Sequence, residues 1–164
     1  MNTKLGISGI ALQWFKSYLS DRQSRVSIGN NYSDPVDLEY GLPQGSILGP
    51  LKFVIYTLPL GKIIRRHALD FHLYADDTQL YCSFDPKIPG ARQHAIERLQ
   101  LCIAEIQEWM SCNKLKLNES KTEFIVLGSP YFLQKLPPVL LKIGDAHIEP
   151  TQSVRNLGII FMQI

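Results

Sequence analysis

The chain runs Phe71-His72-Leu73-Tyr74-Ala75-Asp76-Asp77-Thr78-Gln79-Leu80-Tyr81-Cys82 near its middle. Residues 71–74 and 78–82 are short runs rich in aromatic and aliphatic side chains, a composition that favours β-strands. Ala75, Asp76 and Asp77 lie between the two runs, and aspartate is a favoured turn residue. The stretch therefore predicts a β-hairpin with Asp76 and Asp77 at or beside its tip.

Helices are predicted on both sides of this hairpin. Downstream, residues 91–110 carry apolar side chains at steps of three and four, the spacing of one helical face: Ile96, Leu99, Ile103, Ile106 and Met110. Upstream, residues 9–19 predict an amphipathic helix with Ser8 as its N-cap. Both helices have an apolar side that needs a partner.

A third helix is expected after the sequence Gly41-Leu42-Pro43-Gln44-Gly45-Ser46. Residues 47–58 are largely apolar, and Ser46 is a residue type that caps helices. Pro50 falls in the first turn, where a missing N–H is tolerated. We expect Pro59 and Gly61 to end this helix.

Further strands are predicted from short apolar or alternating runs bounded by turn residues. They are residues 22–28 paired with 36–40, residues 115–117, residues 122–127, residues 139–143 paired with 146–148, and residues 157–161. We interpret the chain as an α+β fold in which hairpins pack against a few helices.

Composition excludes some classes of protein. The 164 residues suffice for one domain, or part of one, with a sizeable core, and the net charge of +2 permits a nucleic-acid partner without requiring one. Cys82, Cys102 and Cys112 are odd in number and lack metal-ligand spacing, which argues against a disulfide framework or a zinc site. No signal peptide and no apolar run of membrane-spanning length is present. We expect an intracellular protein, nuclear or cytoplasmic, that is not secreted and has no membrane partner.

Asp76 and Asp77 allow two interpretations. They can be turn residues that bond their own backbone. Adjacent carboxylates at a rigid tip can also hold Mg²⁺, which prefers oxygen ligands and aligns a nucleoside triphosphate for in-line attack. Three other motifs accompany the pair along the chain and favour the second interpretation: Gly41 to Pro50, Leu117-Asn118-Glu119-Ser120-Lys121-Thr122-Glu123, and Val154-Arg155-Asn156-Leu157-Gly158.

These motifs also have structural explanations. Gly45 and Ser46 can form a turn and a helix cap, or let a nucleotide or template approach exposed N–H groups. Lys121 can be a solvated lysine or a cation beside a triphosphate. The basic cluster, which comprises Lys62, Arg65, Arg66 and His67, is interpreted as a solvated face rather than a phosphate site.

With the motifs in this order, the chain resembles the reverse transcriptase domain of non-LTR (LINE-like) retrotransposons over about residues 5–161. The resemblance implies part of a right-hand polymerase palm and the activity of an RNA-directed DNA polymerase, a nucleotidyltransferase. It implies that Asp76 and Asp77 are catalytic and bind Mg²⁺. The implied partners are an RNA template, a DNA primer and deoxynucleoside triphosphates.

The resemblance assigns roles to other residues as well. Residues expected to contact the nucleotide or template are Gln44, Gly45, Ser46, Tyr74 and Lys121. Residues expected to form the primer grip are Asn156, Leu157 and Gly158.

The chain also departs from the family pattern. The family has another metal-binding aspartate on a strand upstream of the segment that residues 5–27 match, and no residue here matches that motif. We therefore expect residues 1–164 to be a reverse transcriptase domain truncated at both ends, which is inactive alone because two carboxylates do not complete a two-metal site. The alternative is a non-catalytic remnant of a retroelement that binds nucleic acid or protein.

Overall fold

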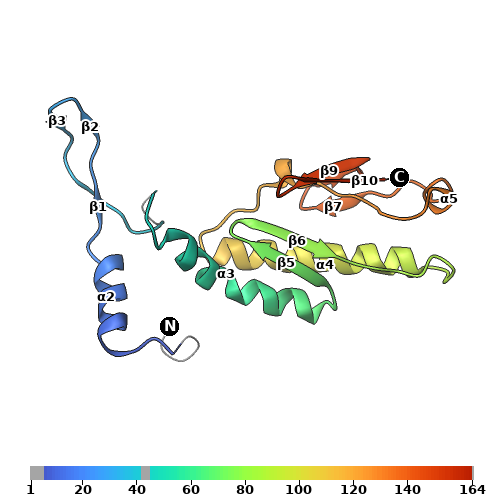
Figure 1. Ribbon diagram of the computed structural model, residues 1–164, viewed down its shortest axis with the longest axis horizontal. Coiled ribbons are helices and arrows are strands. Elements are labelled where there is room, and N and C mark those ends of the chain that lie inside the picture. The colour runs from blue at the N-terminus through green and yellow to red at the C-terminus, as the bar shows by residue number, and fades with distance from the viewer. Residues whose placement is uncertain (1–5, 42–44, 164) are drawn as a thin grey trace. The chain divides into compact units, whose positions relative to one another are not determined.

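The computed structural model describes residues 6–41 and 45–163 (Figure 1). The chain divides into two compact units, Met1–Gly49 and Pro50–Ile164. Helices and small antiparallel hairpins alternate along it, so the predicted α+β class is confirmed. In the described ranges, no helix combines the length and the apolar character that a membrane span requires.

The first unit contains one helix and two pairs of short strands. Helix α2 spans Gly9–Leu19, as predicted, and Ser8 occupies its N-cap position without a side-chain cap hydrogen bond. Strand β1 (Gln23–Ser24) pairs with β4 (Val36–Asp37), and β2 (Ser27–Ile28) pairs with β3 (Asn31–Tyr32). The predicted hairpin is therefore present, closed by a turn at Gly29, whose φ is +58°.

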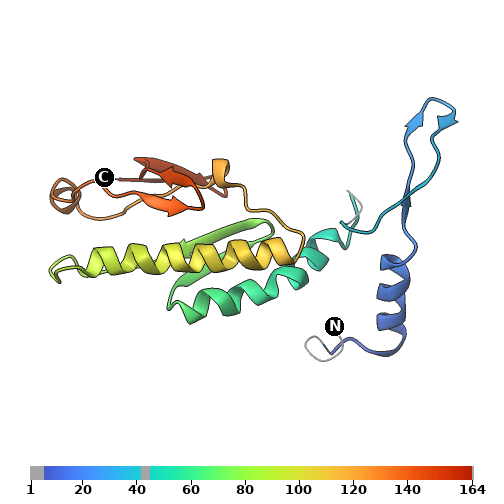
Figure 2. The same cartoon turned by 180° about the vertical axis from the view of Figure 1, so that it is seen from behind.

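The second unit is built around two helices and the central hairpin. Helix α3 spans Gly49–Arg66, strands β5 (Asp70–Tyr74) and β6 (Asp77–Tyr81) form the hairpin, and helix α4 spans Ala91–Cys112. Figures 1 and 2 both show α3, α4 and the hairpin side by side. A buried cluster joins them, formed by Leu60, Ile63, Ile64, Leu69, Cys102 and Ile106.

A second buried cluster joins α4 to the C-terminal strands. It consists of Ile96, Ile103, Leu141 and Ile143. Strand β7 (Leu141–Ile143) pairs with β8 (Ala146–Ile148), and β9 (Ser153–Asn156) pairs with β10 (Ile159–Met162). The 3₁₀-helix η1 (Glu119–Lys121) and the short helix α5 (Pro130–Leu133) lie in the connection from α4 to β7.

The predicted bounds of the third helix are wrong. Helix α3 begins at Gly49, three residues after Ser46, because the Ser46 carbonyl accepts a hydrogen bond from Gly49 N–H in a preceding turn. It then continues through Pro59 and Gly61 to Arg66. An internal proline costs about 3 kcal/mol. Burial of the helix's C-terminal half in the core offsets that cost.

Two predicted strands, residues 115–117 and 122–127, are also wrong. Their place is taken by extended chain, η1 and one isolated bridge between Phe124 and Pro150. Leu117 and Phe124 pack against the second buried cluster. These apolar side chains are thus partly buried against the core although their backbone does not pair in a β-sheet.

Burial also affects a thiol in the core. Cys102 is fully buried, and desolvation, with a further contribution from the Glu105 carboxylate, raises the pKa of the thiol to about 11. The side chain therefore stays neutral at physiological pH and acts as a small apolar residue.

We predict that Ile64→Ala lowers the free energy of unfolding by about 2–5 kcal/mol, because Ile64 is 0% exposed and its loss leaves a cavity between α3 and α4. Urea unfolding followed by Trp109 fluorescence measures this, since Trp109 packs on the same cluster. Trp14→Phe in the background leaves Trp109 as the single tryptophan.

The matched control is Ile159→Ala, because Ile159 is 63% exposed. It should change the free energy of unfolding by no more than about 0.5 kcal/mol. Equal effects of the two substitutions would contradict the assignment of the core.

Candidate active site

The β5–β6 hairpin carries both aspartates at its tip, as predicted. Tyr74 pairs with Asp77, so only Ala75 and Asp76 lie between the paired residues. Ala75 has a φ of +51°, a region that residues with a Cβ rarely adopt, so the tight turn holds backbone strain. Asp76 and Asp77 are exposed. The turn therefore presents two neighbouring carboxylates to solvent.

The two faces of the hairpin differ in chemistry. Residues paired across two antiparallel strands share a face, and Phe71, Leu73 and Leu80 pack on the first buried cluster. The other face carries the alternate residues, among them Tyr74 paired with Asp77 and His72 paired with Gln79. Tyr74 is 58% exposed there. An aromatic ring and a carboxylate thus share the outer face at the tip.

A close contact with α3 seats the hairpin. A Cβ placed on Gly61 would lie 3.0 Å from Phe71 Cζ, so a larger residue here would have to displace the ring by a few tenths of an ångström. The Arg65 guanidinium lies 5.0 Å from the centroid of the same ring, a cation–π contact. Gly61 was predicted to end the helix, but its role in the structure is close packing.

The outer face of β6 is tied to the C-terminal hairpin. Gln79 Nε2 donates a hydrogen bond of 2.7 Å to Asn156 Oδ1, and the hydroxyl of Tyr81 donates to Gln79 Oε1. Asn156 ends β9, directly before the turn at Leu157 and Gly158. The bond thus joins the aspartate hairpin to the predicted primer-grip residues, which are 77 positions further along the chain. Sequence reasoning missed Gln79, although strand alternation places it on the same face as Asp77.

The β9–β10 turn has the backbone of a tight hairpin. Leu157 has a φ of +47° and Gly158 a φ of +85°, and two-residue hairpin turns with both central φ values positive match the strand twist. Leu157 is exposed. The three residues predicted as a primer grip therefore form a hairpin corner, and their role remains a prediction.

Lys121 lies at the end of η1 and is exposed. Its turn is anchored by Glu119, whose Oε1 accepts a hydrogen bond of 2.8 Å from Gln107 Nε2 on α4. A Cβ on Gly144, in the β7–β8 turn, would lie 3.1 Å from the same oxygen. Within the described part of the chain, Lys121 forms no ion pair with Asp76 or Asp77. Its predicted contact with a triphosphate remains a prediction.

The glycine-rich motif belongs to the first unit. Gly45 has a φ of +80° with open space where a Cβ would stand, and Ser46 Oγ is hydrogen-bonded to the Tyr18 hydroxyl. Gln44 lies outside the described residues. The expected proximity of Asp76 and Asp77 to Gly45 joins residues of different units, so it remains a prediction.

The basic cluster has structural contacts. Arg66 and His67 both pair with Glu105 on α4, His67 through a contact of 2.8 Å, and Arg65 covers Phe71. The two contacts with Glu105 hold the end of α3 against α4, and the Arg65 contact holds it against β5. They support the structural interpretation of the cluster over a phosphate site.

The donor set at the tip fits a hard divalent cation. Carboxylate oxygens are the ligands that Mg²⁺ prefers, and one or two carboxylates together with substrate phosphates are its usual partners at nucleotide sites. Asp76 and Asp77 provide two carboxylates. Over residues 6–41 and 45–163, no group of three or more His, Cys, Asp or Glu side chains gathers as a metal site.

Comparisons with known proteins give the same picture as the motifs. The sequence model of the family described as "Reverse transcriptase (RNA-dependent DNA polymerase)" matches residues 2–161. The chain is 33% identical over 152 residues to the "Probable RNA-directed DNA polymerase from transposon BS" of Drosophila melanogaster, a match that covers 88% of this chain and 16% of that relative. The chain thus spans about a sixth of that relative's length. No solved structure matches significantly.

We predict that Gln79 and Asn156 are energetically coupled. Gln79→Ala and Asn156→Ala should each destabilise the second unit, and the double variant should lose less than their sum, with a coupling free energy of about 1 kcal/mol. Urea unfolding of the four proteins measures this cycle. The amides of the β9–β10 hairpin should also exchange hydrogen faster in Gln79→Ala.

The exposed pair Gln93 and Glu97, on one face of α4, serves as the control. Its coupling free energy should be only about 0.2–0.5 kcal/mol. If Gln79 and Asn156 couple no more strongly than this pair, the bond does not hold the two hairpins together.

Proposed function

The chain belongs to the reverse transcriptase (RNA-dependent DNA polymerase) family, and we propose that it forms part of the polymerase palm of a non-LTR transposon reverse transcriptase. The observation that carries the proposal is the pair Asp76 and Asp77 at the exposed tip of a hairpin that is packed on two helices. A rigid hairpin that holds carboxylates in place suits phosphoryl-type transfer, because catalysis of that reaction rests on positioning and electrostatics.

Asp76 and Asp77 are the proposed catalytic and metal-binding residues. Their exposed carboxylates would hold Mg²⁺, which when bound neutralises charge on a triphosphate and orients it for in-line attack. The short turn limits how far the carboxylates can move, since strand pairing begins again at Asp77. The strained φ of Ala75 persists because the paired strands on either side impose it.

Other residues are proposed to bind and orient the substrates. Tyr74 offers an exposed ring beside Asp77, suited to stacking against a sugar or base at the primer end. The hairpin corner at Leu157 would press on the primer backbone, and the bond from Gln79 to Asn156 would set its distance from the tip. Lys121 would place a cation beside the triphosphate.

The glycine-rich turn is proposed to contact the nucleotide or template. Gly45 lacks a Cβ and stands in open space, so that a sugar or base could approach its backbone closely. Ser46 and Gln44 complete this proposed contact. The proposed substrates are an RNA template, a DNA primer and deoxynucleoside triphosphates, in line with the family's description.

The test uses a hybrid protein. Residues 2–161 replace the matching segment of the Drosophila transposon BS polymerase, which supplies the rest of that protein. We predict that the hybrid extends a DNA primer on an RNA template in the presence of Mg²⁺. The hybrid with Asp76→Asn and Asp77→Asn should lose at least about a hundredfold in rate, because the substitutions keep the side-chain shape and remove both charges.

Two controls accompany this test. The 164-residue chain alone is expected not to extend the primer, because positioning depends on a complete ligand set. Asp145→Asn in the hybrid removes a carboxylate at the β7–β8 turn, far along the chain from the tip, and should leave the rate unchanged. An inactive hybrid with native-like melting would favour a non-catalytic, nucleic-acid-binding role. A hybrid whose activity survives the double substitution would show that the site is misassigned.

We further predict that Lys121→Gln in the hybrid lowers kcat on the order of tenfold and changes the KM for the primer-template little, because the proposed contact is with the triphosphate. Steady-state primer extension at varied primer-template concentration, with saturating nucleotide, measures both constants. Lys116→Gln removes another exposed lysine from the same connection and is the control. Equal behaviour of the two variants would place Lys121 among ordinary solvated lysines.

A further inference from the structure

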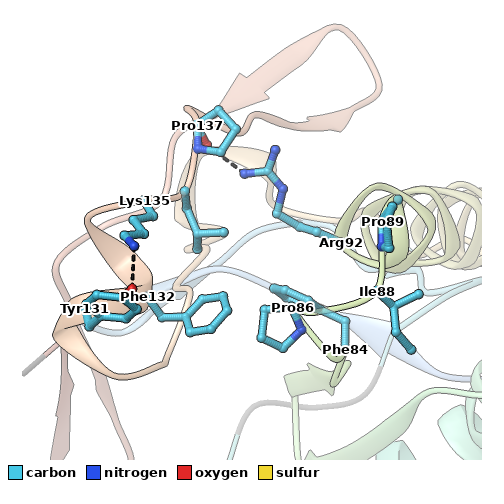
Figure 3. A pocket seen from close by; sticks show the side chains of 11 residues that line it. Phe84, Pro86, Ile88, Pro89, Arg92, Tyr131, Phe132, Lys135 and Pro137 are labelled. Carbon is cyan, nitrogen blue, oxygen red and sulfur yellow. Dashed lines mark hydrogen bonds between the residues drawn. The ribbon is translucent and has the colours of Figure 1, made fainter.

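An open apolar groove lies between two loops of the second unit. One wall is the segment from β6 to the first turn of α4, and the other is the segment around α5. Its volume is about 370 Å³, within the range of small-ligand sites, and its apolar lining includes Phe84, Pro86, Ile88, Phe132, Leu136 and Pro137. Figure 3 shows the Phe132 ring directed across the groove toward Pro86.

A second hollow extends the groove. It has a volume of about 360 Å³ and shares Phe84, Pro86, Phe132 and Leu136 with the first. The two hollows are therefore adjacent, and we refer to them together as the track. A track of this kind suits an extended chain molecule better than a compact ligand.

The walls are held in place before any ligand arrives. Arg92 Nη1, from α4, donates a hydrogen bond of 2.7 Å to the carbonyl of Pro137 on the opposite wall (Figure 3). The loop wall is braced by a bond of 3.1 Å from Ile88 N–H to the Asp85 carbonyl. Prolines on both walls restrict φ and so reduce the entropy lost on binding.

The charges that line the track are positive. Arg92 and Lys135 line it, and no acidic residue is among its lining residues in the described chain. Lys135 Nζ lies 3.9 Å from the centroid of the Tyr131 ring and is hydrogen-bonded to the Tyr131 hydroxyl. One acid, Asp85, stands in the loop wall and accepts a hydrogen bond from Lys87 N–H. The track therefore favours an anionic occupant.

Aromatic rings accompany these charges. Tyr131 is 67% exposed, and Phe84 and Phe132 are partly buried in the lining. Aromatic platforms interleaved with cations are the means by which proteins bind single-stranded nucleic acids, since every base has a face that can stack. An acidic peptide would satisfy the two cations but would leave the rings without a flat partner.

We propose that this groove is a second nucleic-acid site, which holds a single-stranded RNA segment by stacking on Tyr131 and by phosphate contacts with Lys135 and Arg92. The choice of RNA rests on the proposed function.

The groove lies beyond the end of β6 that is opposite to Asp77 (Figure 1). Phe84 follows Asp77 by seven residues, a reach of up to about 23 Å in extended chain. The RNA held here is therefore a part of the strand distant from the reacting end.

The test measures binding of a fluorescein-labelled oligouridylate of about eight nucleotides to the 164-residue chain by anisotropy, without Mg²⁺ or nucleotides. Tyr131→Leu should weaken binding roughly tenfold, the scale of one lost base–aromatic stack. Tyr131→Phe keeps the ring, loses only the hydroxyl that meets Lys135, and should bind within about twofold of the parent. Because Tyr131 is so exposed, neither change should alter thermal melting.

The charge contribution has its own measurement. Lys135→Gln should reduce the slope of log K against log salt by about 0.7, the value for one phosphate contact with a single strand. Lys142→Gln removes another exposed lysine from β7, outside the groove, and should leave the slope unchanged. Fully paired RNA of the same length should compete poorly, because its bases are already stacked.

The position of the RNA is read by photo-crosslinking with a 4-thiouridine oligonucleotide. Crosslinks in residues 84–92 or 130–137 support the groove, whereas crosslinks confined to the β5–β6 tip overturn it. The proposal is also overturned if the Tyr131→Leu variant binds the RNA as tightly as the Tyr131→Phe variant does. It is overturned as well if polyglutamate at equal charge concentration displaces the RNA, because that result would indicate a site for an acidic peptide. An inactive hybrid polymerase refutes the proposed function but leaves this binding result standing.

Discussion

Burial of one apolar face of α4 against two sets of partners is the constraint on which the second unit depends. Cys102 and Ile106 of α4 meet α3 and the inner face of the β5–β6 hairpin, while Ile96 and Ile103 meet β7. Leu80 and Leu99 pack against both clusters and so join them. Because α4 cannot turn about its axis without exposing part of this face, the elements packed on it are fixed relative to each other. The aspartates at the tip of the β5–β6 hairpin are therefore also held in a fixed position relative to α4.

Apolar packing positions the strands, and partly buried amide hydrogen bonds specify which loops meet. The bond from Gln79 to Asn156 and the bond from Gln107 to Glu119 each join a predicted motif to another element. A partly buried amide that loses its partner is left with an unsatisfied polar group, so a shifted loop costs more free energy than the bond itself contributes. Such bonds therefore select one arrangement among several that apolar packing would allow.

Sequence reasoning succeeded where local chemistry decides the structure. The spacing of Ile96, Leu99, Ile103 and Ile106 gave α4, and the turn chemistry at Asp76 and Gly144 gave two hairpins. It failed where tertiary contacts prevail: Pro59 sits inside α3 because the following turns are buried, and residues around Phe124 reach the core without forming a strand. The position of Asp76 and Asp77 at a hairpin tip was predicted from the turn pattern. Gln79 was missed because a single-sequence pattern does not show which distant residue faces it.

Strand β6 connects the two proposed sites, which are the aspartates at the hairpin tip and the RNA groove. Its first residue, Asp77, stands at the tip, and the chain that leaves its last residue, Tyr81, forms one wall of the groove. Core packing at Leu80, between these ends, prevents the strand from sliding along the core. The bond from Arg92 to Pro137 joins α4 to the opposite wall, which carries Tyr131. RNA anchored on Tyr131 would therefore lie at a set distance from the carboxylates, whatever its sequence. Stacking and phosphate contacts tolerate every base, so such an anchor would limit the movement of the strand without selecting which base is copied.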